Sequence, residues 1–88
     1  MPGFVGMNTE QVKQVSKQVD QEALKLQSDI TNIGTKISGA DWKGPDREKF
    51  IADWNHQRGQ VVKVCEMLRQ TAKTMANNAQ EQDQASSR

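Results

Sequence analysis

Apolar residues recur along the first half of the chain at alternating spacings of four and three. One row, with members seven residues apart, contains Val12, Val19, Leu26 and Ile33. A second row, four residues further on, contains Ser16, Ala23, Ile30 and Ile37. Both rows fall on one side of an α-helix, so the pattern predicts a long amphipathic helix over residues 8–38.

Local signals mark the two ends of this helix. Asn8 suits the N-cap position, and Gln11 stands three residues later, where its side chain can bond back to the cap. The stretch contains no proline and a single internal glycine, Gly34. Gly39 follows the apolar rows, and we expect it to end the helix in the left-handed conformation that a Cβ atom disfavours.

A second pair of seven-residue rows follows a break at residues 39–44. One row contains Ile51, Arg58, Cys65, Ala72 and Ala79. The other contains Trp54, Val61, Leu68 and Met75. Pro45 suits the first helical position, and Asp46 and Glu48 place negative charge against the positive end of the helix dipole. We expect a helix over residues 45–79, in which Gly59 marks a close approach of the two helices, and a fraying polar tail over residues 80–88.

Each predicted helix has about 30–35 residues, which corresponds to about 45–50 Å. The short break makes them antiparallel, so residues 1–88 form a single all-α helical hairpin. Two helices leave much of the apolar seam in water, and the single cysteine excludes an internal disulfide. We therefore expect two hairpins to form a four-helix bundle. The predicted dimer seam contains Val12, Val19, Leu26, Ile30, Ile33, Ile51, Val61, Cys65, Leu68 and Met75.

Composition narrows the possible functions. Twelve Lys and Arg residues against eleven Asp and Glu give a net charge of +1, and the charges are scattered along the chain. This balance disfavours binding to nucleic acid, and polar faces rich in glutamine disfavour stable membrane insertion. The first residues lack the positive patch and apolar run of a cleaved signal peptide, so we expect any export to proceed without one.

The residues present give little support for a catalytic function. His56 and Cys65 are the only imidazole and thiol, and nine residues of helix place them on opposite faces, about 13 Å apart along the axis. Asp53 and His56 share a face, but two ligands make a poor metal site, and a solvated helix face is the simpler interpretation. We expect no enzymatic activity, no metal and no cofactor.

Arg58 is the one charged residue in a row of otherwise apolar or small side chains. In one interpretation its stem packs against the seam while its guanidinium reaches water. In the other it pairs with an acid and sets the register or the choice of partner. Within this chain, Glu22 and Asp29 lie at the edge of the first seam and are the candidate acids.

The break between the helices carries a further motif. Trp42, Lys43 and Gly44 lie at the bend between two long helices, and Phe50 and Trp54 follow in the second helix. This W-x-G turn followed by F-x-x-x-W resembles the WXG family, the small substrates of bacterial type VII secretion, in its actinobacterial, early-secreted-antigen-like branch. The resemblance extends over about residues 6–82.

The resemblance implies a fold and a route of export. Members of this family are helical hairpins that pair as homodimers or heterodimers and leave the cell folded, through a membrane apparatus driven by an ATPase. The turn of one chain and the tail of its partner form a composite export signal, in which the tail carries a tyrosine followed four residues later by an acid. This chain has no tyrosine, whereas Glu81 or Asp83 supplies the acid.

The resemblance also assigns roles to the aromatic residues. Trp42 and Gly44 are then the part of the signal that the export apparatus recognises. Phe50 and Trp54 lie one helical turn apart, and we expect them to stack and pack beneath Trp42 as an apolar plug at the end of the bundle. Trp42 itself is either part of this plug or a surface that the apparatus reads.

Three functional hypotheses follow. The first is a secreted, non-enzymatic protein exported as a dimer by an ESX-like type VII system, with itself or a second WXG-like hairpin and the membrane ATPase as partners. The second is an intracellular adaptor that pairs with a larger exported toxin, because the tail lacks tyrosine. The third is a free-standing structural coiled coil, in which Trp42 contributes to stability alone.

Overall fold

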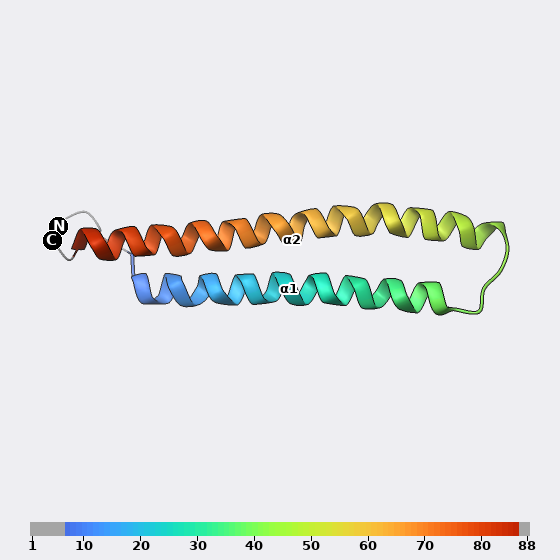
Figure 1. The fold of residues 1–88 in the computed structure, drawn as a ribbon, viewed down its shortest axis with the longest axis horizontal. Helices are drawn as coiled ribbons and strands as arrows, with labels where there is room; N and C mark the ends of the chain where they lie inside the picture. The colour runs from blue at the N-terminus through green and yellow to red at the C-terminus, as the bar shows by residue number, and fades with distance from the viewer. Residues whose placement is uncertain (1–6, 87–88) are drawn as a thin grey trace.

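The protein is an antiparallel pair of helices in the computed structural model, which describes residues 7–86. Helix α1 is Thr9–Gly39 and helix α2 is Pro45–Ser86, and Figure 1 shows the two lying side by side along their length. The predicted all-α helical hairpin is confirmed. Residues 87 and 88 of the predicted tail lie outside the described residues.

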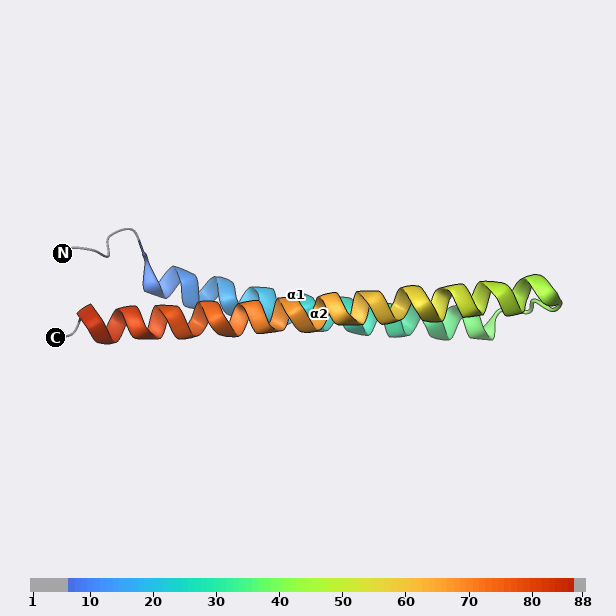
Figure 2. The same ribbon diagram turned by 90° about the horizontal axis from the view of Figure 1, so that it is seen from above.

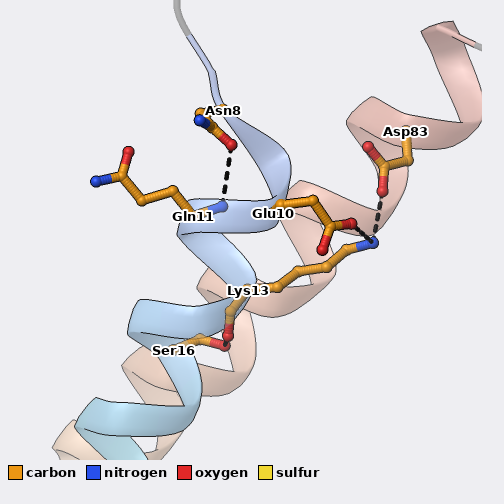
Figure 3. Close-up of polar contacts among 6 residues, drawn as sticks. All are labelled: Asn8, Glu10, Gln11, Lys13, Ser16 and Asp83. Carbon is orange, nitrogen blue, oxygen red and sulfur yellow. Dashed lines mark hydrogen bonds and ion pairs between the residues drawn. The ribbon is translucent and has the colours of Figure 1, made fainter.

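The start of α1 follows its predicted capping signal. The Asn8 side chain accepts a hydrogen bond from the backbone N–H of Gln11, with 3.0 Å between Oδ1 and N. The Gln11 side chain points away from Asn8 (Figure 3). The N-cap is therefore confirmed, although the Gln11 side chain plays no visible part in it.

The end of α1 differs from the prediction. Gly39 does not adopt a left-handed conformation, since the only glycine with a positive φ among the described residues is Gly44, at 114°. Helix α1 ends instead at an extended C-cap, Ala40, whose N–H donates to the Ile37 carbonyl over 3.3 Å. The conformational freedom of glycine is thus used where the connection enters α2, and not where it leaves α1.

Helix α2 begins at Pro45 as predicted but continues to Ser86, well beyond the expected end at Ala79. The predicted helix end at residue 79 was therefore wrong, because residues 80–86 are helical. Those residues carry no apolar period, so local sequence offered no reason to extend the helix. A contact with α1, formed by Asp83, holds this segment in the fold.

The molecule is a rod with principal extents of 67, 16 and 15 Å. Helix α2 is the longer helix, and it extends past α1 at both ends of the rod (Figure 1). Seen from above, α1 crosses α2 at a shallow angle (Figure 2). A rod of this shape has a large surface for its volume, so side chains are seldom enclosed on all sides.

Small side chains form the fully buried layers between the helices. The buried residues of the described chain are Ser16, Ala23, Cys65, Ala72 and Ala79. Ser16 satisfies its hydroxyl within the layer, because Oγ donates to the Lys13 carbonyl over 2.7 Å. The intramolecular contact therefore uses the row that begins with Ser16, and Cys65 belongs to this internal core.

Close approach of the helices occurs at Gly34, and the expectation for Gly59 was wrong. A Cβ atom added to Gly34 would lie 3.0 Å from Nε1 of Trp54, whereas one added to Gly59 would meet nothing within 4 Å. Gly34 therefore provides the space that the Trp54 indole occupies. In an antiparallel hairpin that places Gly34 opposite Trp54, Ala23 and Cys65 lie at the same height along the rod.

Candidate partner-binding face and turn

The turn presents two aromatic rings to solvent. The ring centroids of Trp42 and Phe50 lie 5.2 Å apart with an angle of 56° between the planes, a tilted arrangement typical of favourable aromatic pairs. Trp42 is 37% exposed and Phe50 is 46% exposed. The two rings therefore pack on each other and remain partly exposed to solvent.

Trp54 does not join this pair among the described residues, so the expected stack of Phe50 and Trp54 does not form. Its indole packs against Gly34 instead, and its Nε1 is buried with no hydrogen-bond acceptor in the described part of the chain. A buried donor without an acceptor costs about 1–3 kcal/mol. Apolar contact with α1, not hydrogen bonding, holds this ring in place.

The backbone around Gly44 shapes the turn into a shallow hollow of about 370 Å³. Its walls include Trp42, Lys43 and Arg47. Arg47 connects the two helices, because its Nη2 donates to the Ser38 carbonyl over 3.4 Å, and it lies 3.6 Å from the Glu48 carboxylate. The predicted recognition residues Trp42 and Gly44 thus share one accessible hollow.

One long side of the hairpin carries an apolar groove of about 480 Å³. Val19 and Leu26 of α1 and Leu68 of α2 line it together, so the two helices contribute to one apolar face. Leu26 is 38% exposed and Ile33 is 43% exposed. We call this side the apolar face and define it by Val15, Val19, Leu26, Ile33 and Leu68.

The predicted seam residues thus fall into three groups. Cys65 is buried within the hairpin. Leu26, Ile33 and Leu68 are exposed on the single chain. The remaining members are half-buried: Val12, Val19, Ile30, Ile51, Val61 and Met75.

Charged side chains border the apolar groove on the α1 side. Lys25 and Asp29 form the ion pair expected from their spacing, with 3.1 Å between Nζ and Oδ2. Asp29 is therefore engaged by Lys25 and not by Arg58. No carboxylate within the described residues forms an ion pair with Arg58, so the pairing proposed within this chain is absent.

The opposite long side is polar. A cleft of about 530 Å³ lies between the helices there, and its lining includes Ser16, Lys17 and Lys73. Arg69 and Asp20 join α2 to α1 across this side, with 2.8 Å between Nε and Oδ1. The hairpin therefore has one apolar and one charged long side.

The last turns of α2 are joined to the first turn of α1 (Figure 3). Lys13 forms a hydrogen-bonded ion pair with Asp83 and lies 4.0 Å from Glu10. The hydrogen bond from Lys13, supported by one from Thr9, lowers the pKa of the Asp83 carboxyl below 3.8. The same bond raises the pKa of the Lys13 ammonium above 10.5.

The two candidate acids of the tail therefore differ. Asp83 is engaged in this contact with α1, whereas Glu81 is exposed. Sequence reasoning missed the structural roles of Lys13, Asp20 and Arg69, because the positions that pair across two helices depend on their register. A search for opposite charges at matched heights in an antiparallel hairpin is the signal that identifies them.

Neither helix, in the part of the chain that the structure describes, has a stretch that is both apolar and long enough to cross a lipid bilayer. The chain matches no family model, and no curated protein or solved structure matches it. Functional inference therefore rests on the residues and their geometry.

Proposed function

We propose that this protein is a small, non-enzymatic protein that a bacterial ESX-like type VII secretion system exports folded, as a dimer. Its partners are itself or a second WXG-like hairpin, and the membrane ATPase of the apparatus. It acts outside the cell, after synthesis in the cytoplasm. The proposal rests on the W-x-G motif and on the geometry of the hairpin that carries it.

The turn is the observation that carries this proposal. Trp42 is exposed beside Phe50, and Gly44 has the positive φ that most other residues avoid. The motif therefore lies at the tip of an antiparallel hairpin, where a large aromatic side chain is accessible to another protein. Exposed tryptophan is frequent among residues that dominate binding energy at protein interfaces.

The apolar face supports dimerisation. Leu26, Ile33 and Leu68 remain exposed on a single chain although each is a large apolar residue. A contiguous apolar face of this kind marks a protein interface more often than a scatter of single apolar residues does. A second hairpin packed against this face would complete a four-helix bundle.

Export from an actinobacterial host with a type VII system tests the proposal. We expect Gly44→Ala to reduce the amount of exported protein about tenfold, because strain at this φ costs about 1–3 kcal/mol. Gly39→Ala is the matched control, since Gly39 has no positive φ and its added Cβ meets nothing within 4 Å. Trp42→Ala should block export while leaving the helices folded. Normal export of Gly44→Ala and Trp42→Ala would contradict the proposal.

Sedimentation equilibrium tests the dimer. We expect Leu68→Ser to weaken self-association by at least about tenfold, because it removes apolar area worth about 1.5–3 kcal/mol. Met67→Ser is the matched control, since Met67 is 66% exposed and lies outside the apolar groove. Equal effects of the two substitutions would show that association does not use the apolar face. A chain that is monomeric at all concentrations would point to a heterodimer.

A second candidate function is that of an intracellular adaptor for a larger type VII-exported toxin. Two observations favour it: the chain has no tyrosine, and the Asp83 carboxylate is engaged with Lys13. The signal would then come from the partner's tail. Export of the partner only when this chain is co-expressed, with retention of this chain in the cytoplasm, would support the adaptor.

A further inference from the structure

Arg58 breaks the pattern of the row in which it lies. Cys65 and Ala72, the next two members of that row, are fully buried between the helices. Arg58 is exposed, and no acid in the described chain forms an ion pair with it. Positions where a local rule is broken without compensation are expected to be functional sites.

Arg58 lines a notch of about 360 Å³ between the helices, near the turn. Ile51 and Trp54 supply apolar walls, and Thr31 and Thr35 lie on the α1 side. Both threonine hydroxyls already donate to backbone carbonyls of α1, each over 3.2 Å. Because these hydroxyl protons are already used, the Arg58 guanidinium is the main hydrogen-bond donor available to a ligand in the notch.

Asn55 adds a second donor beside Arg58. Asn55 lines the same notch, and its exposed side-chain amide has no hydrogen-bond partner within the described residues. The notch thus combines a free guanidinium, a free amide and two apolar walls. This set of groups is suited to a planar anion carried on a short apolar stem.

The notch lies on the polar side of the hairpin. Thr35 is nine residues from Leu26 in α1, which is about 180° around the helix at 100° per residue. Asn55 is thirteen residues from Leu68 in α2, or about 140° around that helix. No residue that lines the notch also lines the apolar groove. The notch therefore stays accessible when the apolar face is covered.

We propose that the notch formed by Arg58, Asn55, Ile51 and Trp54 binds a glutamate or aspartate side chain of a protein partner. This second interface goes beyond the dimer and the turn, and it does not depend on type VII export. The carboxylate accepts hydrogen bonds from Arg58 and Asn55. The methylene stem of the acidic side chain lies against Ile51 and Trp54.

Charge distinguishes a carboxylate from a phosphate as the ligand. Arg58 is the only cationic residue among those that line the notch. One guanidinium neutralises a monoanionic carboxylate, whereas a phosphate dianion would keep an unbalanced negative charge. The apolar walls also favour a ligand with methylene groups over inorganic phosphate.

Nuclear magnetic resonance on the full chain tests the proposal, because the protein has only two tryptophans and Trp54 borders the notch. The probe is N-acetylglutamate α-amide, and its neutral match is N-acetylglutamine α-amide. We expect the Trp54 indole N–H signal to shift saturably with the glutamate probe alone. The Trp42 indole signal serves as an internal control and should not move.

Substitutions test whether Arg58 is responsible for binding the glutamate probe. We expect Arg58→Leu to weaken binding of the glutamate probe at least tenfold and to raise the melting temperature, since leucine fits the apolar row better. Arg58→Lys should retain weaker binding, because it keeps the charge without the planar fork. Lys63→Leu, which removes an exposed positive charge from the same helix, should leave the shift unchanged.

Three results would overturn the proposal. One is the absence of a saturable Trp54 shift. Another is an equal shift in Arg58→Leu. The third is a response to inorganic phosphate that equals or exceeds the response to the glutamate probe, which would assign the notch to a different anion.

Discussion

The two halves of the rod are held together in different ways. The terminal half, residues 9–23 and 65–86, contains every fully buried residue of the described chain and both ion pairs that join the helices. The turn half, residues 24–64, contains no fully buried residue among those described. Its large apolar side chains at Leu26, Ile33 and Phe50 are exposed.

This difference follows from side-chain size. Alanine, serine and cysteine fill the terminal layers, so a single pair of helices can approach closely enough to enclose them. Leucine, isoleucine and phenylalanine in the turn half are too large for one partner helix to surround. The terminal half thus encloses small side chains within its own chain, whereas the turn half encloses none. The apolar face extends over both halves, with Val19 and Leu68 in the first and Leu26 and Ile33 in the second, and is available for another protein.

The largest effect is expected from a large side chain in the terminal half. Ala23→Leu should destabilise the hairpin by about 1–3 kcal/mol, because the close-packed layer has no room for three more carbon atoms. Urea unfolding followed by circular dichroism measures the change. Ser28→Leu, at an exposed position of the turn half, is the control and should change stability by less than about 0.5 kcal/mol. Equal effects would mean that the two halves pack alike.

Two glycine substitutions are expected to have the next largest effects on stability. Gly59→Ala should stabilise the protein by about 0.5–1 kcal/mol, because alanine favours helix and its Cβ meets nothing. Gly34→Ala gains the same propensity but pushes its Cβ against the buried Trp54 indole at 3.0 Å. We expect this second variant to be destabilised by about 1 kcal/mol. Thermal melts of both variants measure the difference, and equal stabilisation would show that Trp54 can move aside.

A smaller effect should depend on protein concentration. Ile33→Ala removes an exposed side chain of the turn half, so at low concentration it should change the free energy of unfolding by less than about 0.5 kcal/mol. At concentrations where the chain dimerises, the cost should rise, because the side chain is then buried. Denaturation curves at two concentrations provide the measurement. A cost independent of concentration would place Ile33 outside the interface.

The smallest effect concerns the half-buried pair of Lys13 and Asp83, which ends the terminal half. Asp83 has a lowered pKa, so its contribution is present above pH 3.8 and is lost as the pH falls through its folded-state pKa. Lys13 has a raised pKa, so its contribution is present below pH 10.5 and is lost as the pH rises through its folded-state pKa. Amide hydrogen exchange of residues 80–86 should therefore accelerate below about pH 3.8, after correction for the intrinsic rate.

Substitutions distinguish the effect of the Lys13–Asp83 pair on amide exchange from a general effect of charge. Lys13→Gln should accelerate exchange in residues 80–86 at neutral pH, and Lys17→Gln, one turn further along α1, should not. The exchanged pair Lys13→Asp with Asp83→Lys should restore protection. Unaltered exchange in Lys13→Gln would show that the last turns of α2 hold their helix without α1.

Local sequence was sufficient for most of the fold. The Asn8 cap, the Pro45 start and the seven-residue rows determined two helices and the turn between them, because capping, proline geometry and helical period act over a few residues. The candidate turn could also be predicted, since Trp42 and Gly44 are only two residues apart in the chain. The left-handed conformation was predicted at Gly39, but the positive φ occurs at Gly44, because the way the chain enters α2 decides which glycine adopts it.

Tertiary structure decided which surfaces are used. The rows beginning with Val12 and Ser16 look alike as patterns, and only the packing of α1 on α2 shows that Ser16 and Ala23 are buried whereas Leu26 and Ile33 are exposed. The last turns of α2 contact α1 through Lys13 and Asp83, which are seventy residues apart in the sequence. The roles of Gly34 and Arg58 likewise depend on what faces them across the hairpin. The spacing of apolar residues in the sequence determines the face of the helix on which a residue lies. The register between the two helices determines which residues that face contacts.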